Sequence, residues 1–99
     1  MLPYNLSPRA ARDIASARNW YDQQKPDLGN RFLDAVLLTI RTIRERPNSF
    51  PLAARRTRAT LCDPFPYRVY FRPEQGRIVV LAVYHAARDP ARWNDPDRQ

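Results

Sequence analysis

The sequence predicts one α+β domain, in which a short first strand, an antiparallel helical hairpin and a three-stranded antiparallel meander form one small sheet (β-α-α-β-β-β). Three observations predict this class. Apolar residues recur at helical spacing in the first half of the chain, they alternate with polar residues in much of the second half, and prolines separate the segments. A chain of 99 residues supports one core. We therefore assign residues 1–99 to a single domain, with residues 94–99 as a frayed tail.

The opening residues predict an edge strand that leads into a helix. Apolar and other residues alternate over residues 2–6, and Pro3 restricts such a strand to a sheet edge or to its own first position. Ser7 is a typical N-cap and Pro8 a typical first helical residue. Apolar residues then follow at spacings of four, three and four, so we expect a helix from about Pro8 to Gln24.

A second helix follows after a short connection. Asp27 can cap it, and Pro47 should end it at Arg46 because the residue before a proline disfavours helical geometry. With so few residues between them, the two helices should fold back as an antiparallel hairpin. The apolar stripe of the second helix comprises Leu28, Phe32, Val36, Ile40 and Ile43.

The remaining segments predict three strands. A polar strand is expected over Ala54–Leu61 and a clearer one over Tyr67–Arg72, in which Tyr67, Val69 and Phe71 share one face. Pro73–Gly76 is typical of a tight hairpin turn. The segment Ile78–His85 is apolar on both faces and should be the central strand. Asp89–Trp93 resembles a short helical turn.

Composition excludes several classes of function. Cys62 is the only cysteine, so neither an internal disulfide nor a cysteine-based zinc site is possible, and two glycines do not make a phosphate-binding loop. We expect no cofactor and no metal. The longest apolar run, Ile78–Tyr84, is far shorter than the roughly 20 residues of a membrane helix. Since the first residues resemble no secretory signal, we expect a cytoplasmic protein that does not contact membranes.

The charge is strongly positive, and arginines gather in the predicted sheet. Lysine and arginine together number 17 against 10 acidic residues, which gives a net charge of +7. If the helices cover one face of the sheet, these arginines can line the other face and bind phosphates bidentately. A solvated face of an arginine-rich protein is an equally good interpretation. The arginines concerned are Arg56, Arg58, Arg68 and Arg72, followed by Arg88 and Arg92.

Other chemistry-bearing residues have simpler explanations. His85 is the only histidine and could act as a general acid or base, but a hydrogen-bonded histidine that closes the strand is the better interpretation. Trp20 and Tyr21 fit packing better than base stacking. Cys62 has no histidine near it in sequence and is expected to be an inert thiol.

The motifs taken together resemble the ParE/RelE toxin superfamily, and the resemblance covers nearly the whole chain. It rests on the helix start Ser7–Ile14, the strand Phe65–Phe71 before a glycine turn, and the ending Val83–Pro90 followed by Trp93. This ending, H-x-x-R-D-P-x-x-W, is most similar to the ParE-like, plasmid-stabilisation branch. The resemblance implies the toxin of a type II toxin–antitoxin pair, neutralised by a small antitoxin encoded beside it.

The resemblance leaves the target open between two branches. ParE-like members inhibit DNA gyrase, and RelE-like members cleave messenger RNA in the ribosome. RNA cleavage needs a base, a positive group and an acid. Arginine hardly deprotonates, and Trp93 cannot transfer a proton, so we favour the ParE-like interpretation. For the nuclease alternative the candidate catalytic residues are Arg58, Arg68, His85 and Arg88.

Two further expectations concern partners. For a gyrase inhibitor the target-binding residues would be Arg56, Arg58, Arg68, Arg72, Arg88, Arg92 and Trp93. An antitoxin segment rich in acidic and apolar residues should fold as it binds to the helical hairpin and the open edge of the sheet. A non-toxic module that only binds a partner is the alternative of a different class.

Overall fold

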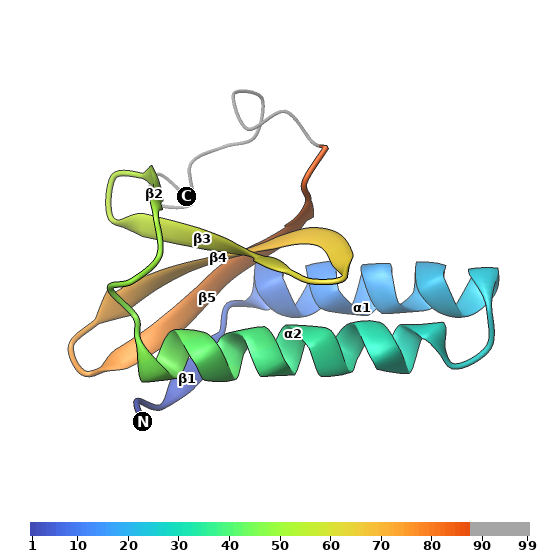
Figure 1. The fold of residues 1–99 in the computed structure, drawn as a ribbon, viewed down its shortest axis with the longest axis horizontal. Coiled ribbons are helices and arrows are strands. Elements are labelled where there is room, and N and C mark those ends of the chain that lie inside the picture. Colours follow the sequence, from blue (N-terminus) through green and yellow to red (C-terminus); the bar gives the residue numbers. More distant parts are fainter. Residues whose placement is uncertain (88–99) are drawn as a thin grey trace.

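The computed structural model describes residues 1–87, which form two layers, a helical hairpin and a five-stranded sheet (Figure 1). The α+β prediction is confirmed. The expected helical turn and tail, residues 89–99, lie outside the described residues. The elements are β1 (Tyr4–Leu6), α1 (Pro8–Gln24), α2 (Leu28–Glu45), β2 (Leu52–Ala54), β3 (Thr57–Cys62), β4 (Phe65–Glu74) and β5 (Arg77–His85).

The start of α1 is fixed by Ser7, as the sequence predicts. Its hydroxyl accepts a hydrogen bond from the Ala10 N–H at 3.0 Å and donates one to the Leu81 carbonyl at 2.9 Å. Pro8 then occupies the first helical turn, where its missing N–H costs nothing. The same cap therefore starts the helix and ties it to β5.

The start of α2 differs from the prediction, because the Asp27 side chain does not cap the helix. Asp27 has a left-handed backbone with φ of 72°, and its carboxylate accepts from the Asn30 side chain at 2.9 Å instead. The capping acceptor comes from the neighbouring helix: the Gly29 N–H donates to Asp22 Oδ1 at 2.8 Å. The sequence could not show this cap because it joins two helices.

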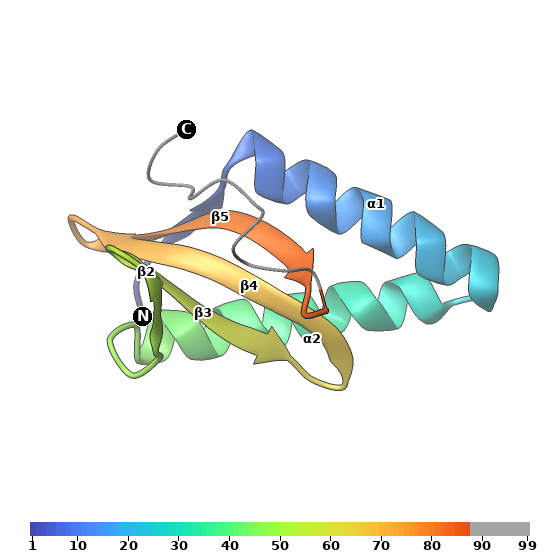
Figure 2. The ribbon, with the colours of Figure 1, turned by 90° about the horizontal axis from the view of Figure 1, so that it is seen from above.

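The two helices lie on one face of the sheet (Figure 2). Their apolar stripes are buried against that face. Helix α1 lies along β5, and α2 lies along β3 and β4. Ile43 is fully buried, as are Phe71 and Val80 on the sheet side. The residues buried from the helices are Ala10, Ile14, Ala17, Phe32, Val36, Ile40 and Ile43.

The sheet is larger and more mixed than the predicted meander. The expected strand Ala54–Leu61 is in fact two strands, β2 and β3, because the chain turns at Arg55 and Arg56. The strand order is β1-β5-β4-β3-β2, with β1 parallel to β5 and the other pairs antiparallel. Strand β5 lies inside the sheet, but the middle position belongs to β4, because β1 is at one edge and the additional strand β2 is at the other.

The β4–β5 connection is a two-residue turn. Both turn residues have a positive φ, 40° at Gln75 and 79° at Gly76. Two-residue hairpins favour this geometry because it matches the twist of the strands, and glycine adopts it without steric cost. The turn was predicted at this place.

Candidate target-binding surface

The register of β4 defines which side chains face away from the helices. Directly paired residues of adjacent strands project on the same side of a sheet. Arg68 pairs with Leu61 of β3 and Tyr84 of β5, while Tyr70 pairs with Ala59 and Ala82. Val69 lies between them and belongs to the core under the helices. We call the opposite side, which carries Arg68, Tyr70, Arg72 and Tyr84, the far face.

Arg68 and Arg72 are both on the far face, as predicted, but they are engaged differently. Arg68 Nη1 donates to the Ala86 carbonyl at 3.3 Å, which leaves its charge without a counter-ion in that contact. Arg72 Nε donates to Glu74 Oε2 at 2.7 Å, and Arg77 lies 4.0 Å from the other Glu74 oxygen. The positive charge of Arg72 is therefore largely balanced by Glu74.

Arg58 is on the other side of the sheet, so the expected single basic face is not formed. It pairs directly with Phe71, whose side chain is in the core beneath the helices. Its Nη1 donates to the Phe50 carbonyl at 2.6 Å. Arg56, Arg58 and Thr60 alternate in the sequence, but alternation alone does not tell which face of a sheet a set of residues occupies.

Arg56 lies in a turn rather than on a strand of the sheet. Arg56 is exposed in the turn between β2 and β3. Arg88, Arg92 and Trp93 lie outside the described residues. Of the four described arginines predicted to share one face, Arg68 and Arg72 do so.

Arg9 was not predicted for this surface, yet it reaches the edge of the far face. Its guanidinium carbon lies 4.8 Å from the centroid of the Tyr84 ring, a cation–π contact. Tyr84 packs edge to face with Tyr70 at 5.8 Å, within a small second cluster with Ala59 and Ala82. Arg68 pairs with Tyr84, so its side chain projects from the same face of the sheet as this ring. Sequence spacing gave no signal for a contact between the first turn of α1 and the end of β5.

His85 is on the helix side of the sheet and away from Arg68. It pairs with Tyr67, and the two rings meet edge to face at 5.3 Å. The Ala87 N–H donates to His85 Nδ1 at 3.0 Å, which closes the end of β5. In the neutral ring the proton therefore belongs to Nε2. This is the structural role that the sequence favours.

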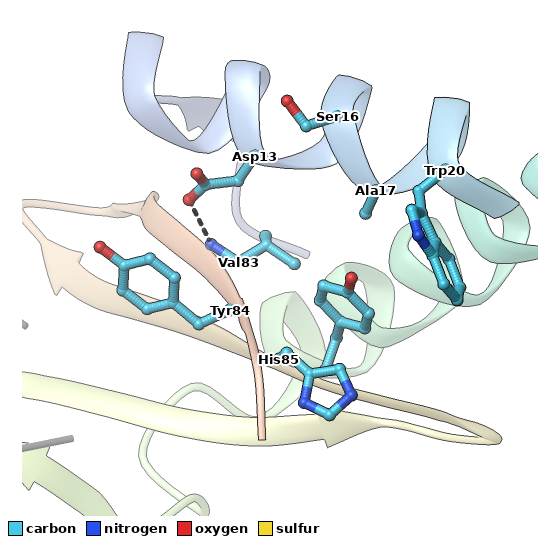
Figure 3. Close-up of a pocket in the computed structure, with 8 residues that line it drawn as sticks. Asp13, Ser16, Ala17, Trp20, Val83, Tyr84 and His85 are labelled. Atoms are coloured by element: carbon cyan, nitrogen blue, oxygen red, sulfur yellow. Dashed lines mark hydrogen bonds between the residues drawn. The ribbon is translucent and has the colours of Figure 1, made fainter. Parts of the chain in front are cut away.

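A pocket of about 220 Å³ lies between α1 and the end of β5 (Figure 3). Trp20 forms part of its wall and is 54% exposed, and His85 lies opposite. Asp13 Oδ2 accepts from the Val83 N–H at 3.0 Å and so satisfies the backbone of β5 where β1 no longer pairs with it. The pocket does not include Arg68 or Arg72.

Among the candidate residues within 1–87, the far face brings together no acid–base pair, because His85 is on the helix side of the sheet. Cys62 is buried, and burial first, then the nearby Asp63 carboxylate, raise the pKa of its thiol to about 11, partly offset by a hydrogen bond from Thr39. It is an inert thiol at neutral pH. Within residues 1–87 no group of histidine, cysteine or acidic side chains is arranged to hold a metal ion. The far face instead offers arginine and tyrosine side chains suited to binding.

The fold and this surface define a class: a small basic α+β protein that presents arginines beside a sheet covered on its other face by a helical hairpin. The family described as ParE toxin of the type II toxin–antitoxin system parDE matches residues 4–90. The chain belongs to this ParE toxin family. No helix of the described part of the chain is long and apolar enough to cross a membrane.

Individual relatives agree with the family. The chain is 33% identical to Toxin ParE2 of Mycobacterium tuberculosis strains CDC 1551 / Oshkosh and ATCC 25618 / H37Rv over 82 residues, which covers 79% of this chain and 75% of each relative. A solved chain titled "Chromosomal ParDE TA system from P. aeruginosa" superposes with a TM-score of 0.76 at 16% identity, and the match covers 86% of this chain and 96% of that chain. At this identity the solved structure supports the fold alone.

Proposed function

We propose that this ParE-type toxin arrests growth by binding DNA gyrase, and that a cognate antitoxin neutralises it by forming a complex. One observation carries the choice of mechanism: His85, the only histidine, is on the helix side of the sheet, while Arg68 is on the far face. A nuclease that used this pair would need both groups at one phosphate. Their separation supports an activity that depends on binding.

The proposed gyrase contacts are centred on the far face. Arg68 is the first candidate, since its described contact is to a carbonyl and leaves its charge available for an anionic partner. Arg56 and Arg72 remain candidates, together with Arg88, Arg92 and Trp93. We leave Arg58 out because its guanidinium is bonded to the Phe50 carbonyl on the other side of the sheet. Since gyrase acts on chromosomal DNA, this function requires a cytoplasmic protein.

The purified protein tests this proposal in two assays, gyrase supercoiling and ribosome-dependent cleavage of messenger RNA. We expect inhibited supercoiling and intact transcripts. His85→Gln keeps hydrogen-bonding capacity but removes the titratable ring, and it should retain most of the inhibition. Arg68→Gln should weaken it. Arg31→Gln, an exposed position on α2 with the same loss of charge, is the matched control.

Cleavage of transcripts that depends on His85 would contradict the gyrase proposal. If the wild-type protein fragments transcripts and a folded His85→Gln variant cleaves roughly 10²–10⁴-fold more slowly, the protein is a nuclease and the gyrase proposal is wrong. For the antitoxin, co-expression with the product of the adjacent reading frame should restore growth. If growth stays arrested and no complex can be isolated, neutralisation by that protein is excluded.

A further inference from the structure

The centre of the far face is buried, although the helices pack on the other side of the sheet. Tyr70 is 5% exposed and Tyr84 is 4% exposed, and Ala59 and Ala82 complete the same cluster. Tyr70 pairs with Ala82, and Arg68 pairs with Tyr84, so all these side chains project from the face opposite the helices. A sheet face without a second layer leaves one side of a large ring in water. The burial of both tyrosine rings therefore indicates that a further segment covers them.

The described elements do not supply this cover. Helices α1 and α2 lie on the opposite face of the sheet (Figure 1), and β1 and β2 are at its two edges. Arg9 reaches the far face from α1, with its guanidinium carbon 4.8 Å from the centroid of the Tyr84 ring. One side chain at the edge does not span both rings, whose centroids are 5.8 Å apart. Among residues 1–87, no helix or strand forms a second layer over Tyr70 and Tyr84.

The end of β5 directs the chain toward the far face. Arg68, whose side chain is on that face, donates from Nη1 to the Ala86 carbonyl at 3.3 Å. The Ala86 N–H donates to the Pro66 carbonyl at 2.6 Å and so holds this residue against β4. Figure 1 shows the last described residues rising from the sheet on the side away from the helices. The chain that follows Ala87 therefore starts at the far face, three residues after Tyr84.

Residues 88–93, which lie outside the described residues, have the length and the side chain that the cover needs. Six extended residues span up to about 20 Å, more than enough to pass both tyrosine rings. Trp93 is the only large apolar side chain after Ala87, and aromatic rings pack favourably on one another. A second copy of the chain is a poorer cover, because two copies of net charge +7 repel each other.

We propose that residues 88–93 of this chain dock on the far face, with the indole of Trp93 over the rings of Tyr70 and Tyr84. The segment then forms a partial second layer on the side of the sheet opposite the helices. It is held by apolar contact with the tyrosines and by the hydrogen bonds that fix Ala86 at the end of β5.

The docking gives the proposed gyrase contacts one location. Arg88 and Arg92 belong to the docked segment and so lie on the face that carries Arg68. Trp93 then acts as a positioning residue for these arginines. This consequence rests on the proposed function, whereas the docking itself does not.

Tryptophan fluorescence tests the docking in the full-length protein. The chain has two tryptophans, and Trp20→Phe removes the one that is 54% exposed on α1 while it keeps an aromatic ring beside Tyr21. We expect the Trp93 emission of this variant to lie at a shorter wavelength in the folded protein than in denaturant, and acrylamide to quench it several-fold less efficiently. Equal quenching in the two states overturns the proposal. Protection that disappears on dilution assigns the cover to a second copy and also overturns it.

Double-mutant cycles identify the face on which Trp93 lies. Tyr70→Leu removes a ring from the far face, and Tyr67→Leu is the matched change on the helix side of the same strand. With Trp93→Ala, Tyr70→Leu should show a coupling of roughly fivefold or more in the unfolding equilibrium constant, whereas Tyr67→Leu should be additive. Denaturant unfolding of the single and double variants measures both values.

The two cycles separate the possible positions of the indole. Additivity of Trp93→Ala with Tyr70→Leu overturns the docking, and coupling to Tyr67→Leu alone places Trp93 on the helix side and overturns it too. Neither measurement involves gyrase. An inactive protein in the supercoiling assay would therefore refute the gyrase proposal and not the docking, and undocked residues 88–93 would refute the docking and not the gyrase proposal.

Discussion

The buried thiol of Cys62 makes the free energy of unfolding depend on pH in the alkaline range. Burial raises the pKa of its thiol to about 11, so in the folded state the thiol keeps its proton above the pH at which an unfolded chain loses it. The unfolded state then binds fewer protons, and the free energy of unfolding falls as pH rises. This contribution is fully present below about pH 8.5–9 and is lost as pH approaches 11.

We expect Cys62→Ala to flatten this dependence. Between pH 9 and 11 the wild-type protein should lose about 2 kcal/mol more stability than the variant. Denaturant unfolding at several pH values measures how steeply the free energy of unfolding falls with pH in the wild-type protein and in the variant. Tyr21, whose pKa is raised by burial and by the neighbouring Tyr67 and Cys62, leaves a residual slope in the variant. Equal slopes in the two proteins would contradict the assignment to Cys62.

At the scale of elements, the close approach of the two helices depends on Gly29. A Cβ atom there would lie 2.5 Å from Asp22 Oδ1 and 2.6 Å from the Arg18 carbonyl oxygen, which belongs to the helix backbone. Alanine normally stabilises a helix by about 1 kcal/mol relative to glycine. Here the clash should outweigh that stabilisation. We therefore expect Gly29→Ala to lower the free energy of unfolding by about 1–3 kcal/mol.

Gly76→Ala is the matched control for this prediction. A Cβ at Gly76 meets no atom within 4 Å, so only the strain of its φ of 79° is felt. Chemical denaturation of both variants separates steric clash from backbone strain. A Gly29→Ala variant as stable as the wild-type protein would show that the helices separate without cost.

The ends of elements were easier to predict than their lateral contacts. Ser7–Pro8 and the prolines after each helix act within a few residues, so the helix bounds follow from local chemistry. The cap from Asp22 and the pairing of Arg58 with Phe71 join distant segments and leave no local pattern. For the same reason the sequence identified arginines of the sheet but not the face of Arg58, nor the contact of Arg9 with Tyr84.

At the scale of the molecule, the arginines of the far face and the apolar groove of Leu38 and Leu61 beside α2 differ in chemistry but meet at β3, where Leu61 pairs with Arg68. The far face carries Arg68 and Arg72, and the groove of Leu38 and Leu61 lies at the edge beside α2. The proposed gyrase site and an antitoxin bound at this edge can therefore use different residues of one chain, although they adjoin at Leu61 and Arg68. Neutralisation then follows if the bound antitoxin extends over the far face or blocks the approach of gyrase.

The net charge of +7 should make the association rate with the proposed acidic antitoxin segment sensitive to salt. Long-range attraction accelerates the encounter and is screened over about 8 Å at physiological ionic strength, whereas contacts between apolar side chains determine dissociation. We expect the association rate constant to fall as salt is raised, with little change in dissociation. Arg12→Gln should slow association slightly, and Arg12→Lys, which keeps the charge at this exposed position, should not. Stopped-flow experiments at several ionic strengths measure these association rate constants. A salt-independent association rate would rule out electrostatic steering.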